Sequence, residues 1–250
     1  MSKINFLRRL TYRAEIVKPI RVLGLRKIAR RLYWFWTKPK NNIFTLEVGG
    51  IVGQFRIHTP EELRLFEGDI LLEKKSLERF LSFVCLGDII YDIGANIGLY
   101  TIFLAKAVGE KGQVIAFEPG SQNFDRLREN MILNKLGNVR IFKKALGHAT
   151  KKAKLYGEGG RSSLISPPSE RTDIDFQVVE MVRGDNFREK EDLPLPRAIK
   201  IDVEGYEYAV LQGLQRTLSL PICELCLVEV HSDLLPLGLK PEVVLSLLKS

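Results

Sequence analysis

Short apolar runs alternate with longer amphipathic runs along the chain from residue 88 onward. The short runs are apolar at nearly every position and predict buried strands, whereas the longer runs repeat apolar residues every three or four positions and predict helices. The predicted strands span residues 88–93, 114–117, 139–143, 198–203 and 223–230, and the predicted helices span residues 99–108, 121–134 and 206–218. Buried strands that alternate with helices indicate a parallel sheet covered on both faces. The pattern therefore predicts an α/β fold, a three-layer sandwich with a mainly parallel sheet.

A hairpin and a helical segment are predicted ahead of this alternating region. Residues 43–48 and 51–57 are strand-like runs on either side of Gly49 and Gly50, a pair that favours a tight turn. Residues 60–84 have a helical pattern with breaks. We therefore expect a hairpin followed by a helical cap before the core begins.

Two further strands, at residues 151–156 and 176–182, flank a polar loop rich in glycine and serine within the core region. The predicted domains are a leader at residues 1–40, a hairpin and helical cap at residues 41–87, and a core at residues 88–250.

The leader contains a basic amphipathic segment at residues 21–36. At about 100° per residue, its apolar side chains fall on one side of a helix and its basic side chains fall on the other. Such a helix can lie on an anionic membrane surface, or it can pack on the core with its basic face in water. Both interpretations stay open.

Charge is distributed unevenly along the chain. The net charge is +8, but the excess of basic side chains within residues 1–40 exceeds that value, so the rest of the chain is net negative. The body of the protein is therefore not a general surface for polyanions, and nucleic acid is a poor candidate partner for it. An electrostatic partner, such as an anionic membrane, is expected at the leader.

Composition places the chain among ordinary globular proteins. Apolar residues make up 45% and charged residues 27%, and no apolar run is long enough to cross a bilayer. Three cysteines, Cys85, Cys223 and Cys226, do not make a disulfide framework and favour a reducing compartment. Cys223 and Cys226 have the spacing of metal ligands, but within a strand their sulfurs would point to opposite faces, so we interpret both as core. With no secretory signal at the N-terminus, we expect a cytoplasmic protein, peripheral at the inner face of the membrane if the leader binds there.

Candidate ligand-binding residues follow the first two strands of the core. In parallel sheets, ligands bind at the carboxyl ends of the strands. The first strand is followed by a loop with Asp92, Gly94, Asn96 and Gly98, whose glycines let the backbone approach a ligand closely. Glu118 ends the second strand, where a carboxylate can accept hydrogen bonds from ribose hydroxyls. A tight turn beside an exposed glutamate would leave the same pattern without a ligand, but the two features together favour a nucleoside.

The composition of this loop separates two classes of nucleoside cofactor. A dinucleotide site usually has the pattern Gly-x-Gly-x-x-Gly, which lets a pyrophosphate sit on a helix N-terminus. Here an acid, Asp92, comes just before the loop, where it would repel a pyrophosphate but could meet the ammonium group of S-adenosylmethionine. Hydride transfer therefore becomes a minor alternative.

Charged residues are concentrated where the fourth and fifth strands end. In an extended strand, Lys200, Asp202 and Glu204 would share one face, and Glu229 and His231 follow the fifth strand. Carboxylates and a histidine that converge on one cleft can act as a general base or hold a divalent metal. Solvated strand ends would explain each residue singly.

Four ordered motifs resemble the FkbM family of S-adenosylmethionine-dependent methyltransferases. They occur at residues 91–100, 116–119, 145–147 and 199–207, and the resemblance extends over about residues 70–235. It implies a class I methyltransferase (Rossmann-like) fold and O-methylation of a hydroxyl on a sugar, polyketide or other small or glycan acceptor. A nucleic-acid methyltransferase that uses the basic leader is one alternative, and a catalytically idle cofactor-binding module is another.

The resemblance also implies roles for individual residues. The residues that it implies around S-adenosylmethionine are Asp92, Gly94, Asn96 and Gly98 at the methionine portion, Glu118 at the ribose and Ala145 at the adenine edge. The residues that it implies at the acceptor are Asp202, Glu204 and His231. No metal is assigned.

Two departures from the family pattern affect the prediction. Of a threonine-leucine-aspartate run expected before the fourth strand, only Asp185 is retained. The family fold normally adds two more strands beside residues 223–230, and the given sequence ends at residue 250 without them. We therefore expect residues 223–230 to have an unpaired edge, and exposed edges recruit other strands. We expect the hairpin at residues 43–57 or a second copy of the chain in a homodimer to cover this edge, or the chain to be a shortened form.

Overall fold

The computed structural model describes residues 38–59, 62–63, 70–157, 162–165, 175–231, 234–235 and 241–246. The chain divides into two compact units. The first comprises residues 1–46 and 54–75, and the second comprises residues 47–53 and 76–250. The amphipathic helix predicted within the leader lies outside the described residues.

The predicted hairpin is confirmed. Strands β1 (Ile43–Val48) and β2 (Ile51–Arg56) form a two-stranded sheet of their own, after a short 3-10 helix, η1 (Lys40–Asn42). Gly49 and Gly50 at the turn have φ angles of +57° and +79°, which residues with a Cβ rarely adopt. Of the predicted helical cap, the structure describes helix α5 (Ile70–Leu81).

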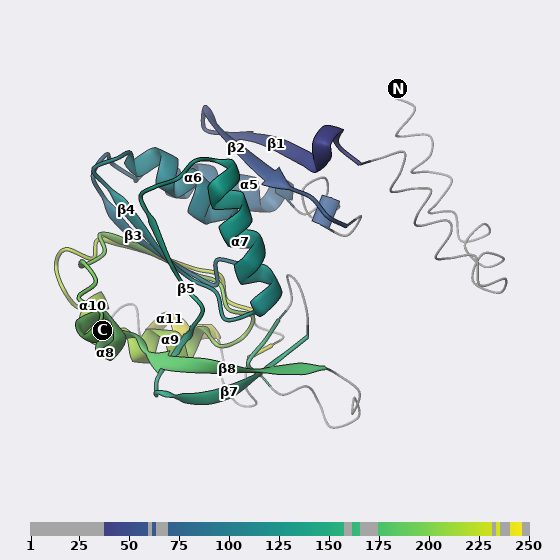
Figure 1. Cartoon of the computed structure of the whole chain (residues 1–250). Helices are drawn as coiled ribbons and strands as arrows, with labels where there is room; N and C mark the ends of the chain where they lie inside the picture. The colour runs from purple at the N-terminus through teal and green to yellow at the C-terminus, as the bar shows by residue number, and fades with distance from the viewer. Residues whose placement is uncertain are drawn as a thin grey trace, which may run out of the picture. The chain divides into compact units, whose positions relative to one another are not determined.

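Five parallel strands form the central sheet of the second unit (Figure 1). They are β3 (Ile89–Ile93), β4 (Gln113–Phe117), β5 (Val139–Phe142), β9 (Ala198–Ile201) and β10 (Leu225–Val228). Their spatial order is β10-β9-β3-β4-β5, and every neighbouring pair is parallel. The chain therefore runs outward from β3 to β5 and then crosses back to β9, which makes the boundary between β3 and β9 the topological switch point.

Helices cover both faces of this sheet, as predicted. The helices are α6 (Leu99–Val108), α7 (Ser121–Leu133), α8 (Gly184–Lys190), α9 (Glu207–Gly213), α10 (Gln215–Leu218) and α11 (Pro241–Ser246). In Figure 1, α6 and α7 lie on one side of the strands, and α8 and α9 lie on the other. The predicted three-layer α/β sandwich with a mainly parallel sheet is confirmed.

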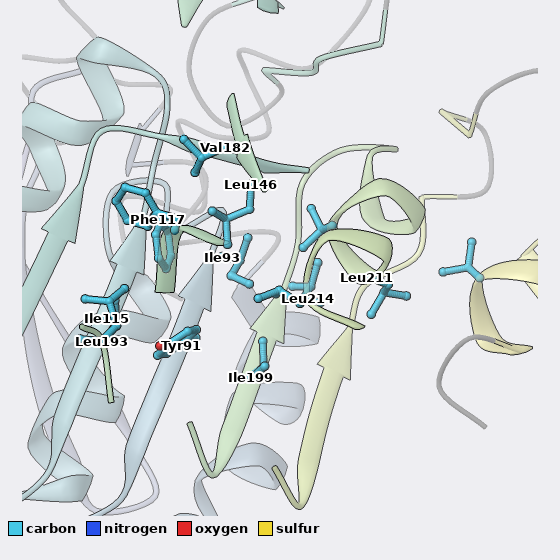
Figure 2. Close-up of a cluster of buried hydrophobic side chains, with 14 residues drawn as sticks. Tyr91, Ile93, Ile115, Phe117, Leu146, Val182, Leu193, Ile199, Leu211 and Leu214 are labelled. Carbon is cyan, nitrogen blue, oxygen red and sulfur yellow. The ribbon is translucent and has the colours of Figure 1, made fainter. Parts of the chain in front are cut away.

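Alternate residues of each strand supply the two halves of the core. Tyr91, Ile93 and Phe117 belong to a cluster that also contains Leu211 of α9 and Leu214, which joins α9 to α10 (Figure 2). The intervening positions face α6 and α7; Ala116, for example, packs with Leu127 of α7. Successive side chains point to opposite faces of the sheet, and both faces are covered, so the strands are apolar at nearly every position.

A smaller three-stranded sheet is built from residues that lie between β5 and β9 in the sequence. It contains the two extra strands that the sequence predicts. It has the order β6-β8-β7, with β6 (Ala145–Gly147) parallel to β8 (Phe176–Arg183) and β7 (Lys151–Tyr156) antiparallel to β8. Its first strand carries Ala145.

The fourth and fifth core strands are shorter than the sequence predicts. Strand β9 ends at Ile201, because the chain turns through positive φ angles at Glu204 (+51°) and Gly205 (+95°). Glu204 therefore lies in a turn, and the prediction that it shares a strand face with Lys200 is wrong. Asp202 follows the strand directly, and its Oδ2 lies 3.3 Å from Lys200 Nζ.

Strand β10 lies at the edge of the central sheet. Among the described residues it pairs with β9 only, and β1 and β2 form a separate sheet. The prediction that the hairpin at residues 43–57 pairs with this edge is therefore wrong. Each described helix is too short or too polar to span a membrane.

Candidate active site

The loop between β3 and α6 has the backbone conformation that its glycines suggested. Gly94 and Gly98 have φ angles of +79° and +95°, and Asn96 has a φ of +52°. A Cβ on Gly94 would lie 1.8 Å from the carbonyl oxygen of Asp202, so no other residue fits there without moving the backbone. The loop after β3 is thus packed directly against the chain that leaves β9.

Glu118 joins this loop to the end of β4. Its side chain is 5% exposed and accepts hydrogen bonds from the backbone N–H groups of Asn96 and Gly120, both at 2.8 Å. Burial raises the pKa of Glu118 to about 7, although these two N–H groups act in the opposite direction. Each carboxylate oxygen keeps a lone pair that a ligand hydroxyl could use.

A cleft at the switch point brings most of the predicted site residues together. Its lining includes six of them, Gly94, Asn96, Glu118, Ala145, Asp202 and Glu204. They come from the ends of β3, β4 and β9 and from the smaller sheet. Residues expected at the cofactor and residues expected at the acceptor therefore share one cavity.

Asp92 does not stand at the mouth of the loop. Its side chain is fully buried, it accepts a hydrogen bond from Thr101 Oγ1 at 2.5 Å, and its Oδ1 lies 3.5 Å from Lys200 Nζ. The expectation that this carboxylate is placed to meet an ammonium group at the loop mouth is wrong, because α6 covers it. Gly98 also lies outside the cleft lining and begins α6.

Three of the predicted side chains converge beyond β9 and β10. His231 Nε2 lies 3.8 Å from Asp202 Oδ1 and 3.7 Å from Glu204 Oε2. One ligand atom from each of these residues lies within 4.8 Å of the others, close enough to share a proton or a divalent cation. Glu229 is 58% exposed, and its Oε1 lies 3.8 Å from the same imidazole nitrogen.

Glu207 orients His231, and sequence reasoning did not single it out. Glu207 is fully buried; its Oε1 lies 2.9 Å from His231 Nδ1 and accepts the Gly205 N–H at 2.9 Å. The bond to Glu207 raises the pKa of His231 to about 9, and Glu204 and Asp202 act in the same direction against partial burial. The imidazole is therefore protonated at neutral pH. The sequence signal that could have pointed to Glu207 is its position as the last residue of the motif at residues 199–207.

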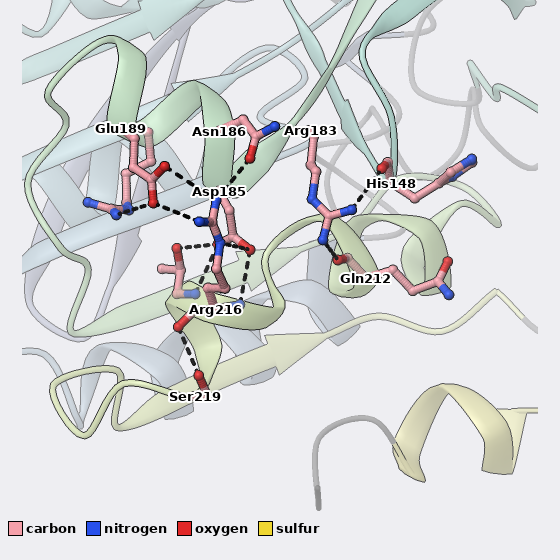
Figure 3. Close-up of polar contacts among 10 residues, drawn as sticks. His148, Arg183, Asp185, Asn186, Glu189, Gln212, Arg216 and Ser219 are labelled. Carbon is pink, nitrogen blue, oxygen red and sulfur yellow. Dashed lines mark hydrogen bonds and ion pairs between the residues drawn. The ribbon is translucent and has the colours of Figure 1, made fainter.

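The retained Asp185 has a structural place in the fold. It is fully buried at the start of α8 and accepts the N–H groups of Arg216 (3.0 Å) and Thr217 (2.9 Å), and also the Thr217 hydroxyl (2.7 Å). Figure 3 shows this cluster at the beginning of α10, with Arg216 reaching back toward Glu189. Asp185 therefore joins α8 to α10 and does not line the cleft.

Comparisons with known proteins point to one family. A family model described as the methyltransferase FkbM domain matches residues 92–238. Hexuronic acid methyltransferase AglP from Haloferax volcanii is 26% identical over 227 residues, with 90% of this chain and 88% of the relative covered. Methyltransferase sdnD from Sordaria araneosa is 32% identical over 155 residues, with 50% of this chain and 60% of the relative covered. Methyltransferase 1 from Beauveria bassiana is 26% identical over 144 residues, with 50% of this chain and 57% of the relative covered.

Proposed function

Because the chain belongs to the FkbM family of methyltransferases, we propose that it transfers the methyl group of S-adenosylmethionine to a hydroxyl of a sugar or of another small or glycan acceptor. The family confirms the resemblance seen in the sequence. The protein is an S-adenosylmethionine-dependent methyltransferase, and S-adenosylmethionine is its cofactor. The residue roles and the acceptor that follow are proposals.

The cofactor occupies the cleft at the switch point in this proposal. The loop with Gly94, Asn96 and Gly98 surrounds the methionine portion, Glu118 accepts the ribose hydroxyls, and Ala145 packs at the adenine edge. The support is that Gly94, Asn96, Glu118 and Ala145 line one cavity at the carboxyl ends of the strands. Asp92 acts from beneath the loop, since its carboxylate is buried.

Asp202, Glu204 and His231 act on the acceptor. The sulfonium methyl is already activated, so the protein must hold oxygen, methyl carbon and sulfur in line and take up the hydroxyl proton. The oxygen becomes strongly acidic as the new bond forms, so a carboxylate can accept its proton. Glu204 is our candidate for that base, while the protonated His231, held by Glu207, orients the carboxylates. The observation that carries this proposal is that Asp202 and Glu204 line the same cleft as the cofactor residues.

The charge around the acceptor position favours an uncharged hydroxyl. Asp202, Glu204 and Glu229 place carboxylates there, and these would repel an acidic acceptor group. The relative from Haloferax volcanii is named for a hexuronic acid, a sugar that offers both hydroxyls and a carboxylate. We propose that this chain methylates the hydroxyls of such a sugar.

Transfer of a labelled methyl group tests the proposal. The full chain is incubated with methyl-labelled cofactor and with methyl glucoside, glucuronic acid or RNA. We expect label in the sugars that mild alkali does not release, because alkali cleaves a methyl ester but not a methyl ether. Label that is lost in alkali would contradict methylation of a hydroxyl. Label in RNA alone would indicate the nucleic-acid alternative. Cofactor binding without transfer to any acceptor would indicate an idle binding module.

We also propose that residues 1–40 hold a cytoplasmic protein at an anionic membrane surface. Support comes from the basic face of the segment at residues 21–36 and from three free cysteines, which suit a reducing compartment. The full chain should co-sediment with anionic vesicles, less so at high salt, and not with neutral vesicles. A full-length variant with Arg26, Lys27, Arg30 and Arg31 changed to Glu should lose this binding. Equal sedimentation of variant and wild type would contradict the proposal.

A further inference from the structure

Lys200 is a buried lysine on β9, between the cofactor loop and the acceptor carboxylates. It is 4% exposed. Its Nζ donates to the carbonyl oxygen of Gly94 at 3.0 Å and lies 3.3 Å from Asp202 Oδ2 and 3.5 Å from Asp92 Oδ1. It also lies 5.0 Å from the ring centroid of Tyr100, within cation-π range. One ammonium group therefore has three oxygen partners and an aromatic neighbour.

These partners belong to different segments of the site. Asp92 is on β3, Gly94 is in the loop that follows β3, and Asp202 follows β9. The close packing of Gly94 against the carbonyl oxygen of Asp202 brings the same two segments together through the backbone. Lys200 thus contacts both the loop proposed to surround the methyl donor, at Gly94, and the carboxylate proposed to face the acceptor, at Asp202.

Stability alone does not account for a lysine at this position. A buried ammonium loses its hydration, and replacing a buried ion pair by apolar side chains of similar volume is often neutral or stabilising. What an apolar residue could not do is donate to the Gly94 carbonyl and attract the Asp202 carboxylate at once. Those two contacts fix the relative position of donor and acceptor segments.

We propose that Lys200 is a positioning residue that holds the cofactor loop and the Asp202 carboxylate in one arrangement. This inference rests on the proposed role of Asp202 toward the acceptor. Methyl transfer requires three atoms in line, and a misplacement of about 1 Å costs on the order of a hundredfold in rate. A single buried ammonium that contacts both segments limits that misplacement.

Binding of S-adenosylhomocysteine by the full chain tests the loop contact and needs no acceptor. Lys200→Met keeps the length of the side chain and removes the charge. We expect the dissociation constant to rise about tenfold, because the loop carbonyl loses a charged donor. Since this variant leaves Asp92 buried without a cation, the pair Asp92→Asn and Asp92→Asn/Lys200→Met gives a second comparison in which position 92 carries no charge.

Arg197 supplies a matched control at the opposite end of β9. Its guanidinium contacts Asp88 at 2.7 Å, Glu224 at 3.0 Å and the Phe83 carbonyl at 2.9 Å. Arg197→Met therefore also removes a cation with three oxygen partners, but far along the strand from the cleft. We expect it to lower the melting temperature and to leave the dissociation constant unchanged.

Turnover tests the contact with Asp202. At saturating cofactor and acceptor, kcat of Lys200→Met should fall about a hundredfold while KM for the acceptor changes little. Lys200→Arg, which keeps a charged donor, should recover part of this loss. In a Lys200→Met background, Asp202→Asn should have a smaller effect than in the wild type, because the two residues act together.

The outcomes separate this inference from the proposed function. If folded Lys200→Met binds S-adenosylhomocysteine as the wild type does, or keeps the wild-type kcat, Lys200 is not a positioning residue. If the wild type methylates no sugar, the proposed acceptor is wrong, and the binding comparison still decides on Lys200. A loss of affinity in Lys200→Met that Arg197→Met matches would assign both residues to stability alone and overturn the inference.

Discussion

At the scale of single residues, Glu118 shows how burial prepares a carboxylate for a ligand. Two backbone N–H groups already hold its oxygens, so the side chain is oriented before any cofactor arrives. Burial nevertheless disfavours its charge and raises its pKa to about 7. Ribose hydroxyls would add donors to the ionised form and favour it. Cofactor binding and ionisation of Glu118 are therefore coupled.

Glu118→Ala should weaken binding of S-adenosylhomocysteine by about 2 kcal/mol, the value of hydrogen bonds to a charged group. Isothermal titration calorimetry measures the change. In the wild type, affinity should rise with pH through about 7, because the carboxylate is ionised only above its raised pKa. Glu118→Gln should bind with an affinity that is independent of pH in this range. Wild-type affinity in the alanine variant would remove Glu118 from the cofactor site.

Substitution of Glu204 or His231 should lower the rate of methyl transfer without lowering the affinity for the cofactor. We expect Glu204→Gln and His231→Ala to lower kcat by about a hundredfold or more and to leave S-adenosylhomocysteine binding nearly unchanged, because proton acceptance matters in the transition state. Steady-state kinetics and calorimetry on the same preparations check this. Parallel losses of binding and turnover would contradict the division of roles.

The pH profile and a chelator serve as further controls on this pair. If the protonated His231 orients the carboxylates, kcat should fall as pH rises through about 9, where that proton is lost. A rise in kcat through the same pH would make neutral His231 the base instead. Turnover that persists after exhaustive chelation would show that these residues act without an ion, although their spacing could accept one.

At the scale of elements, the buried carboxylate of Asp185 takes the place of a capping side chain at the N-terminus of α10. Helix α10 is short and has no capping side chain of its own, so its first N–H groups need an acceptor from elsewhere. Asp185, at the start of α8, accepts two of them and the Thr217 hydroxyl. The departure from the family motif around this residue therefore spares the contact on which two helices depend.

Asp185→Asn should destabilise the protein by about 2 kcal/mol, because an amide offers one acceptor oxygen where the carboxylate uses two. Chemical denaturation checks the free energy of unfolding. Asp125→Asn is the matched control; its carboxylate is 65% exposed in a surface pair with Arg128, so stability should change little. S-adenosylhomocysteine affinity should be the same in both variants. A loss of affinity in Asp185→Asn alone would give this residue a role at the cleft.

The elements also show which features the sequence could predict. Strands such as β3 and β4 are apolar on both faces and end in motif residues, so the loop after β3 and Glu118 could be placed in advance. The burial of Asp92 could not, because it depends on how α6 packs over β3. The contact between Glu207 and His231 could not be predicted either, since it joins the start of α9 to the segment that follows β10. Local pattern predicts strand ends, whereas pairing between distant segments requires the fold.

At the scale of the whole molecule, the position of β10 raises the question of what lies beside the central sheet. Alternating short and long runs predicted a parallel sheet, but they carry no information on the outer edge. In the described part of the chain, β10 has a neighbour on one side. An open edge with apolar residues favours pairing with another strand. Pairing of two copies along this edge in a homodimer therefore stays a prediction.

Hydrogen exchange at β10 can test this prediction amide by amide. The backbone N–H of Leu225 donates to the carbonyl oxygen of Arg197, and that of Glu229 donates to the carbonyl oxygen of Ile201. Alternate N–H groups of this segment therefore point toward β9. The N–H groups of Cys226 and Val228 therefore point away from β9, toward the outer edge. In a monomer we expect these two amides to exchange much faster than those of Leu225 and Glu229, because nothing in the described chain accepts their hydrogen bonds.

The molecular mass in solution, measured with exchange on the same sample, completes the test. If two copies pair edge to edge, Cys226 and Val228 should become as slow as their neighbours in the dimer and speed up on dilution to the monomer. Fast exchange at every concentration would exclude this pairing. Slow exchange of both amides in a monomer would contradict an open edge altogether, because it would require an acceptor within the same chain.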